Sequence, residues 1–228
     1  MRNPYFKTPP VVQNLIIANC VIFLAMTLIP GVEEFCDKYL CLFWLNSIPK
    51  EYKEYMDMLS LNAMDFPKGF ENPLFHSYQL VTYMFLHAGF GHLFSNMFAL
   101  WMFGRTLEYE LGSQRFLTYY MVCGIGAALI QMGVASLFGE NLALLGASGA
   151  VMGLLLAFGV MHPNNMIYII PLPFPIKAKW FVTGYAVLEI VLGWSGAQTG
   201  VAHFAHVGGM LWGLALLFYW RKRGKVWF

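Results

Sequence analysis

The polar residues of this chain that could do chemistry stand inside segments that are otherwise strongly apolar. Ser148 lies between glycines, His206 opens one apolar run, and His92 precedes Asn96 by four residues in another. Polar and ionisable side chains are costly at membrane depth. A hydroxyl, two imidazoles and an amide on separate segments therefore predict a shared, water-accessible site.

Ser148 and His206 have the residue types of a nucleophile and its general base. A serine hydroxyl is a weak nucleophile and needs a base within about 2.6–3.2 Å to take its proton. His206 is the best candidate, because it opens the last apolar segment on the same predicted side on which Ser148 opens the fourth. His92 and Asn96 are one helical turn apart and can both donate hydrogen bonds. We expect them, with the Ser148 backbone N–H, to stabilise the oxyanion that forms when an amide is attacked.

Composition places the chain outside the range of soluble globular domains. Of its 228 residues, 58% are hydrophobic and 11% are charged, with a mean hydropathy of +0.57. Apolar stretches of about 20 residues are long enough to cross a bilayer. Such stretches are predicted at 11–29, 91–107, 116–138, 142–161, 176–192 and 201–220. We therefore predict an all-α membrane protein, in which residues 1–228 form one six-transmembrane-helix bundle with a long outward loop, 31–79, between helices 1 and 2.

The basic residues predict the orientation of these spans. Loop 31–79 holds four lysines against eight acidic residues, and the other ten basic residues fall on the opposite side. Because Lys and Arg are enriched in cytoplasmic loops, we expect both termini and the Pro-rich loop 163–175 in the cytoplasm, in a multi-pass protein of the cell membrane. The basic run 221–225 directly follows a span and indicates orientation rather than nucleic-acid binding.

Small residues predict that the fourth and sixth spans approach closely. Each carries a pair of glycines four residues apart, the spacing that lets helix backbones meet in lipid. A further glycine permits a tight turn before Ser148, and His206 shares a helix face with the sixth-span pair. The glycines are Gly146, Gly149, Gly153, Gly209 and Gly213.

Each of these features also has a purely structural interpretation. A glycine-flanked serine in a membrane helix is often a packing motif, and a lone histidine near a helix end is usually structural. His87 and His203 remain candidates for a supporting role beside the site. Cys36 and Cys41 could form a disulfide in an oxidising compartment, but sequence spacing does not show that the geometry permits one.

Taken together and in order, the motifs resemble those of the rhomboid family of intramembrane serine proteases. The matching segments are His92-Leu-Phe-Ser-Asn96, Gly104-Arg-Thr-Leu-Glu108, Leu111-Gly-Ser113, Gly146-Ala-Ser-Gly149 and Ala205-His206-Val-Gly-Gly209-Met-Leu-Trp-Gly213. The resemblance covers most of the chain from Gln79 onward. It implies a Ser148/His206 dyad without an acidic third member, an oxyanion site that includes His92 and Asn96, and a membrane-inserted loop before the second span.

Several residues are interpreted against this resemblance. Glu108 and Glu189 are expected to serve helix packing or pairing, with Arg105 as a candidate partner, and not to complete a triad. Two positions depart from common family residues. The pair Tyr78-Gln79 stands where many relatives have Trp-Arg, and Met152 stands where many have an aromatic residue four places after the serine.

We expect an intramembrane serine endopeptidase that cleaves peptide bonds in or near transmembrane segments of membrane proteins. Its partners are then a transmembrane protein substrate and the lipid bilayer, with no nucleic acid, cofactor or metal. The oligomeric state stays open. The alternative is a non-catalytic rhomboid-like membrane protein that binds transmembrane clients, although such relatives generally lack the serine or the histidine.

Overall fold

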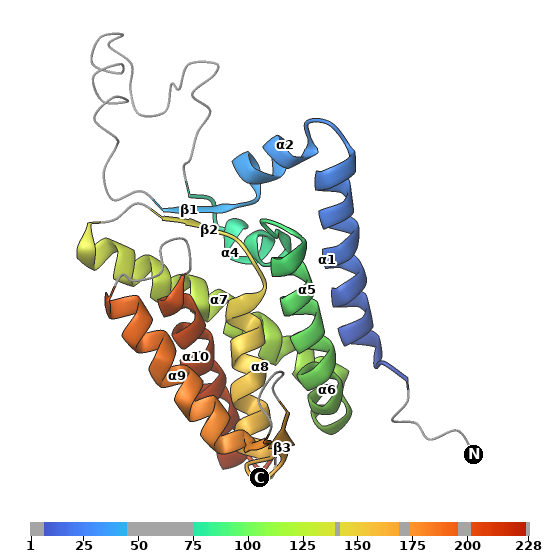
Figure 1. The fold of residues 1–228 in the computed structure, drawn as a ribbon, viewed down its shortest axis with the longest axis vertical. Helices are drawn as coiled ribbons and strands as arrows, with labels where there is room; N and C mark the ends of the chain where they lie inside the picture. Colours follow the sequence, from blue (N-terminus) through green and yellow to red (C-terminus); the bar gives the residue numbers. More distant parts are fainter. Residues whose placement is uncertain (1–6, 45–74, 140–141, 169–173, 196–201, 227–228) are drawn as a thin grey trace.

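Helices that run alongside one another make up most of the structure, a computed structural model (Figure 1). It describes residues 7–44, 75–139, 142–168, 174–195 and 202–226. Most of the predicted outward loop 31–79 and part of the Pro-rich loop 163–175 therefore lie outside the described residues.

The helices account for all but the shortest elements. They are α1 (Pro10–Leu28), α2 (Val32–Tyr39), α4 (Gln79–Thr82), α5 (Phe90–Ala99), α6 (Arg105–Leu111), α7 (Ser113–Phe138), α8 (Ser148–Met161), α9 (Ala178–Ser195) and α10 (His203–Lys222). A 3₁₀ turn, η2 (Tyr83–Phe85), follows α4, and a π-helical segment, η3 (Leu100–Gly104), joins α5 to α6. The strands are β1 (Leu42–Trp44), β2 (Leu142–Leu144), β3 (Met166–Ile167) and β4 (Ile176–Lys177).

Helices occupy the six predicted apolar segments, but strands occupy the predicted starts of two of them. The segment predicted from residue 142 begins as strand β2, which pairs antiparallel with β1. The segment predicted from residue 176 begins as β4, which pairs with β3. An apolar run has no period that separates strand from buried helix, so the sequence did not reveal these strands. The fold is therefore mostly helical rather than all-α. Among the described residues, α1 and α7 are long and apolar enough to cross a membrane.

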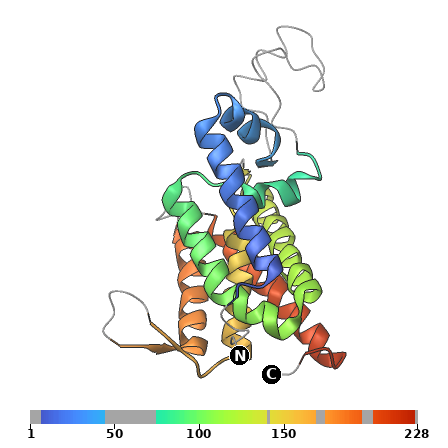
Figure 2. The same cartoon turned by 90° about the vertical axis from the view of Figure 1, so that its right-hand side faces the viewer.

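The arrangement of the helices brings three helix starts together. Helix α10 packs against both α7 and α8, and α9 packs against α8 and α10. Helices α5, α8 and α10 all begin at the end of the bundle where β1 and β2 lie, as Figures 1 and 2 show. Helix α1 begins, and α10 ends, at the opposite end. We refer to these as the strand end and the terminal end of the bundle.

Two tyrosine hydroxyls form hydrogen bonds between central elements of the bundle. Tyr83 and Tyr119 are fully buried. The Tyr83 hydroxyl donates to the carbonyl of Gly124 on α7 at 2.8 Å, and the Tyr119 hydroxyl of α7 donates to the carbonyl of Gly153 on α8 at 2.9 Å. Buried hydroxyls need such partners, because an unpaired polar group in the core is costly. These bonds hold α7 against η2 on one side and α8 on the other.

Glu108 of α6 caps the distant helix α1. Its carboxylate oxygens accept hydrogen bonds from the backbone N–H groups of Val11, at 2.9 Å, and Val12, at 2.7 Å, and from the Ser113 hydroxyl at 2.6 Å. Helix α1 follows Pro9 and has no cap from its own side chains. A carboxylate satisfies its free amides and complements the positive end of its dipole. Glu108 thus joins two helices, as expected, but its donors are backbone amides and the Ser113 hydroxyl, while the predicted partner Arg105 lies over the Trp101 ring.

The segment after α2 is fixed by buried side chains near β1. Cys36 and Cys41 are both free and buried, so the disulfide left open by the sequence is not formed. The Cys41 thiol donates to the carbonyl of Leu144 on β2 at 3.3 Å. Burial, and to a smaller extent the nearby Asp37 carboxylate, raises the pKa of Cys41 to about 12. This thiol is therefore a packing group that supports the β1–β2 pairing.

Candidate active site

The turn before α8 depends on Gly146. Its φ is +118°, in the region that favours glycine, and its N–H donates to the carbonyl of Tyr83 at 2.8 Å. A Cβ added there would lie 2.7 Å from the His92 ring. Any larger residue would therefore meet both backbone strain and a steric clash. The turn ends strand β2 and allows α8 to begin at Ser148.

Backbone contact between α8 and α10 brings the two helix starts together. A methyl group on Gly209 would overlap the carbonyl group of Gly149, and one on Gly213 would overlap the Tyr119 hydroxyl. A Cβ on Gly153 would lie 3.1 Å from the carbonyl of Gly209 and would overlap Cys123. Glycine at these places allows the close approach that small residues permit in membrane helices.

This contact places Ser148 beside His206. The His206 Nε2 atom and the Ser148 Oγ atom are 2.8 Å apart, a normal hydrogen-bond distance. His206 lies in the first turn of α10 and is buried, whereas Ser148 is partly exposed to the cavity described below. A nucleophile and a base in this geometry can exchange a proton.

The other nitrogen of His206 contacts Glu189, contrary to the sequence-based expectation. The Glu189 carboxylate lies 3.0 Å from His206 Nδ1 and 2.7 Å from His203 Nδ1. Glu189 and both histidines are buried. We predicted that Glu189 serves only packing or pairing and that no carboxylate contacts His206. That prediction was wrong, because the Glu189 carboxylate contacts His206 Nδ1. The sequence shows a lone carboxylate in an apolar segment, but it does not show which residues α9 faces.

A cavity of about 750 Å³ opens beside this pair and brings the predicted site residues together. It lies between the starts of α5, α8 and α10 and strand β2. The residues at its wall that matter here are Ser148, His206, His92, Asn96, Met152, Gln131 and Tyr185. Met152, which replaces an aromatic residue common in the family, thus still faces the same space as the imidazole.

The two predicted oxyanion donors differ in their surroundings. Asn96 is buried, and among the described residues its Nδ2 group has no hydrogen-bond partner. His92 is partly exposed, and its ring centroid is 5.0 Å from that of His87 in an edge-to-face arrangement. A buried donor that is left unpaired calls for an explanation, because such groups are rare in folded proteins. An oxyanion in the cavity would provide the missing acceptor.

Two glutamine side chains support the elements around the site. Gln131 was not singled out from the sequence, and the role of Gln79 was left open there. The Gln131 Oε1 atom of α7 accepts a hydrogen bond from the backbone N–H of Ala205 at 2.9 Å, which satisfies a free amide at the start of α10. Gln79 is buried, its Oε1 atom accepts from the N–H of His76 at 3.0 Å, and its amide donates to the Tyr39 carbonyl at 3.4 Å. Gln79 thus provides a local anchor for α4, while Tyr78 is exposed.

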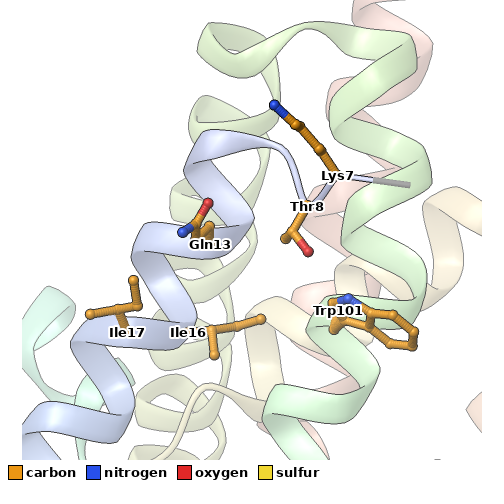
Figure 3. Close-up of a pocket in the computed structure, with 6 residues that line it drawn as sticks. All are labelled: Lys7, Thr8, Gln13, Ile16, Ile17 and Trp101. Carbon is orange, nitrogen blue, oxygen red and sulfur yellow. The ribbon is translucent and has the colours of Figure 1, made fainter. Parts of the chain in front are cut away.

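Figure 3 shows a second cavity, of about 630 Å³, between the start of α1 and η3. The six residues drawn include a lysine, but no imidazole or carboxylate lies among them. Arg105 lies over the Trp101 ring at its edge, 4.8 Å from the centroid. These six residues therefore do not include the serine and imidazole pair that the strand end brings together.

The fold and the site define a helical membrane protein with a serine and a histidine in contact inside a cavity. Residues 75–223 match the family model of the Rhomboid domain, and this match covers more than half of the chain. The chain therefore belongs to the rhomboid family, which confirms the resemblance seen in the sequence.

Curated relatives support this assignment. The chain is 33% identical over 159 residues to RHOMBOID-like protein 6, mitochondrial, of Arabidopsis thaliana, covering 69% of this chain and 48% of the relative. It is 28% identical over 226 residues to Rhomboid protein 1, mitochondrial, of Saccharomyces cerevisiae, covering 96% and 56%. It is 31% identical over 166 residues to Rhomboid-like protein 11, chloroplastic, of Arabidopsis thaliana, covering 64% and 53%. The chain spans about half the length of these relatives.

The names of these relatives correct one prediction. From the sequence we expected a cell-membrane protein with cytoplasmic termini, whereas these relatives are mitochondrial or chloroplastic proteins. That expectation was therefore wrong. The distribution of Lys and Arg reports only the orientation of spans relative to the side of insertion, and it carries no information about which membrane receives the protein.

Proposed function

We propose that this protein is an intramembrane serine endopeptidase in which Ser148 and His206 carry out the chemistry. The observation that supports this most directly is the 2.8 Å distance between Ser148 Oγ and His206 Nε2 beside a cavity. Family membership supports it independently. The substrate class is a membrane protein with a transmembrane segment, cleaved in or beside that segment.

The first half of the reaction forms an acyl-enzyme. His206 Nε2 takes the hydroxyl proton as Ser148 Oγ bonds to the carbonyl carbon of the scissile amide. The resulting imidazolium then gives that proton to the amide nitrogen as the carbon–nitrogen bond breaks. The amine product leaves, and the other half of the substrate remains as an ester on Ser148.

The second half restores the enzyme. A water molecule gives one proton to His206 Nε2 while its oxygen attacks the ester carbon. The imidazolium returns the proton to Ser148 Oγ as the ester bond breaks, and the carboxylic acid product leaves. A cavity that admits water is needed for this step, and Ser148 and His206 both border one.

Negative charge on the carbonyl oxygen needs donors during both halves. Asn96 Nδ2, His92 and the Ser148 backbone N–H are the donors in this proposal. The Asn96 amide lies at the cavity with its Nδ2 group unpaired among the described residues, so it can donate to an oxyanion without breaking another bond. Removing one such donor costs on the order of 10²–10³ in rate in a well-studied serine protease.

The proposal also includes how the protein lies in the bilayer. Residues 1–228 act as one membrane domain, and the six main apolar segments cross the bilayer with the cavity open toward one surface. A substrate helix must unwind near the cavity, because helical carbonyls are hydrogen-bonded and shielded. Helix-destabilising residues near the cleavage point are therefore expected.

The test is cleavage of a single-span substrate by the purified full chain in detergent. The parent protein is expected to cleave, and Ser148→Ala to show no cleavage above background. Ser136→Ala is the matched control, because the Ser136 hydroxyl accepts a bond from Trp44 away from the cavity. This control is expected to retain parental activity.

Two outcomes would overturn the proposal. Cleavage that persists in Ser148→Ala but is lost in Ser95→Ala would move the nucleophile to the other serine of the cavity. Binding of transmembrane clients without cleavage by the parent protein would favour the non-catalytic alternative.

A further inference from the structure

The contacts of Glu189 set the protonation pattern of two histidines. An ionised carboxylate only accepts hydrogen bonds. The nitrogens that face it, His206 Nδ1 at 3.0 Å and His203 Nδ1 at 2.7 Å, must therefore both carry hydrogen. In a neutral imidazole the remaining nitrogen is an acceptor. His206 Nε2 is then the acceptor that faces the Ser148 hydroxyl at 2.8 Å.

A buried carboxylate at this position lowers stability unless hydrogen-bond donors compensate for its lost hydration. Glu189 is only 4% exposed and lies within a largely apolar helix. A buried carboxylate is tolerated when donors compensate for its lost hydration. Here the compensating donors are two imidazoles and the Tyr185 hydroxyl, and one of the imidazoles is the proposed general base.

We propose that Glu189 is a positioning residue for His206, held in place by His203, so that the site works as a Ser148–His206–Glu189 triad. This inference rests on the proposed function. The carboxylate keeps hydrogen on Nδ1, turns the Nε2 lone pair toward Ser148 and stabilises the imidazolium that forms when the serine proton arrives. The proton stays on the imidazole throughout and does not pass to Glu189.

His203 has a distinct part in the triad. Its Nδ1–H bonds to the same carboxylate oxygen that faces His206, Oε2. Among the described residues, its Nε2 atom has no hydrogen-bond partner. The hydrogen bond to Glu189 is thus the contact through which His203 can act, and it helps to fix the position of the carboxylate.

The same three side chains could instead bind a metal ion. Their ligand atoms all lie within 4.8 Å of one another. The distances of 2.7 and 3.0 Å are, however, those of hydrogen bonds from protonated nitrogens. A metal would need both Nδ1 atoms free of hydrogen. We infer the hydrogen-bonded arrangement, and the experiment below includes a chelator to separate the two.

The experiment compares Glu189→Gln with the parent in kcat and KM for a single-span substrate, using full-length protein in detergent. Glutamine keeps the size but removes the charge, and it can hold the imidazole in the wrong tautomer. We expect kcat to fall on the order of 10²- to 10⁴-fold, as in other serine proteases that lose this charge, while KM stays within about twofold. Glu189→Asp is expected to recover part of the loss in kcat, because it restores the carboxylate.

Glu108→Gln is the matched control, since it alters a carboxylate that is buried to the same degree and caps α1 far from the cavity. It is expected to lower the melting temperature and to leave kcat per folded molecule unchanged. His203→Leu serves as a second variant if Glu189→Gln does not fold. It is expected to lower kcat about tenfold, which corresponds to roughly 1.4 kcal/mol of activation free energy, because the bond that orients the carboxylate is lost. A chelator is expected to change neither kcat nor KM.

The failures of the two proposals can be told apart. If the parent does not cleave, or Ser148→Ala cleaves normally, the proposed function fails. If Ser148→Ala is inactive but folded Glu189→Gln retains parental kcat, only the positioning role is overturned. Parental kcat in His203→Leu would overturn its part in the triad. Loss of activity with chelator and recovery with added Zn²⁺ would replace the triad with a metal site.

Discussion

Glu108 and Glu189 are both buried carboxylates, but they accept hydrogen bonds from different kinds of donor. Glu108, at the terminal end of the bundle, accepts from two backbone amides and a serine hydroxyl. Glu189 accepts from two imidazoles and the Tyr185 hydroxyl near the strand end, and one of the imidazoles also contacts Ser148. Backbone amides do not titrate, so the first arrangement can only stabilise the fold. An imidazole nitrogen can accept and release a proton, so the second arrangement can take part in proton transfer.

The surroundings of the two carboxylates also differ in how completely their polar groups are paired. At Glu108 both carboxylate oxygens have donors. At the strand end, Asn96 Nδ2 and His203 Nε2 have no partner among the described residues. Leaving buried groups unpaired lowers stability. The difference suggests that the strand end is arranged for a bound substrate and the terminal end for stability, and each variant below tests one side of that contrast.

The largest expected effect comes from separating α8 from α10. We predict that Gly209→Val abolishes cleavage, because its side chain would overlap the Gly149 carbonyl and displace His206 from Ser148. The measurement is cleavage per milligram of purified protein. Gly133→Val on α7 is the control, since a Cβ there meets nothing within 4 Å. Full activity in Gly209→Val would show that the helices need not approach closely.

Asn96→Ala is expected to lower kcat by about 10²-fold, as the loss of one oxyanion donor does. Its melting temperature should stay level or rise, because the substitution removes a buried group that lacks a partner. Kinetics and thermal unfolding of the same preparation measure both. A fall in stability with unchanged kcat would place Asn96 among the structural residues instead.

Glu108→Ala should show the opposite pattern to Asn96→Ala. We expect the free energy of unfolding to fall by about 2 kcal/mol, since the N-terminal amides of α1 lose their acceptor. Activity per folded molecule should not change. Ser113→Ala removes only one of the three bonds and should cost about 1 kcal/mol. A large loss of kcat in either variant would contradict the division between the two ends.

The smallest effect concerns Cys41, next to β1. Burial raises its pKa to about 12, so in the folded protein the thiol stays protonated at pH 8. Alkylation by iodoacetamide, followed by mass spectrometry, should therefore be slower than for an unfolded chain, whose cysteines ionise near pH 8.5. Because the folded pKa is raised, stability should fall as pH rises above about 8.5. Rapid alkylation at pH 8 without unfolding would contradict the buried position.

The sequence predicted those features that depend on local pattern. Long apolar runs located the main helices, and the glycines around Ser148 and His206 indicated where α8 and α10 meet. These signals work because span length and backbone approach are set by residues close together in the chain. The resemblance of the ordered motifs then indicated the family.

Features that depend on distant contacts could not be predicted in the same way. Strand β1 pairs with β2 across about a hundred residues, and neither strand has a distinctive period. The role of Glu189 depends on which face α9 turns toward α10, and no motif around it reports that. The general rule that a lone ionisable residue in a membrane segment marks a functional site would have singled it out.

Mapping the adduct of a fluorophosphonate probe tests the central claim most directly, namely that His206 activates Ser148. The parent protein and His206→Ala would be labelled in detergent, digested and analysed by tandem mass spectrometry over a time course. The account predicts an adduct on Ser148 in the parent and a rate at least about 10²-fold lower in His206→Ala. An adduct on another residue, or equal labelling rates in the two proteins, would contradict it.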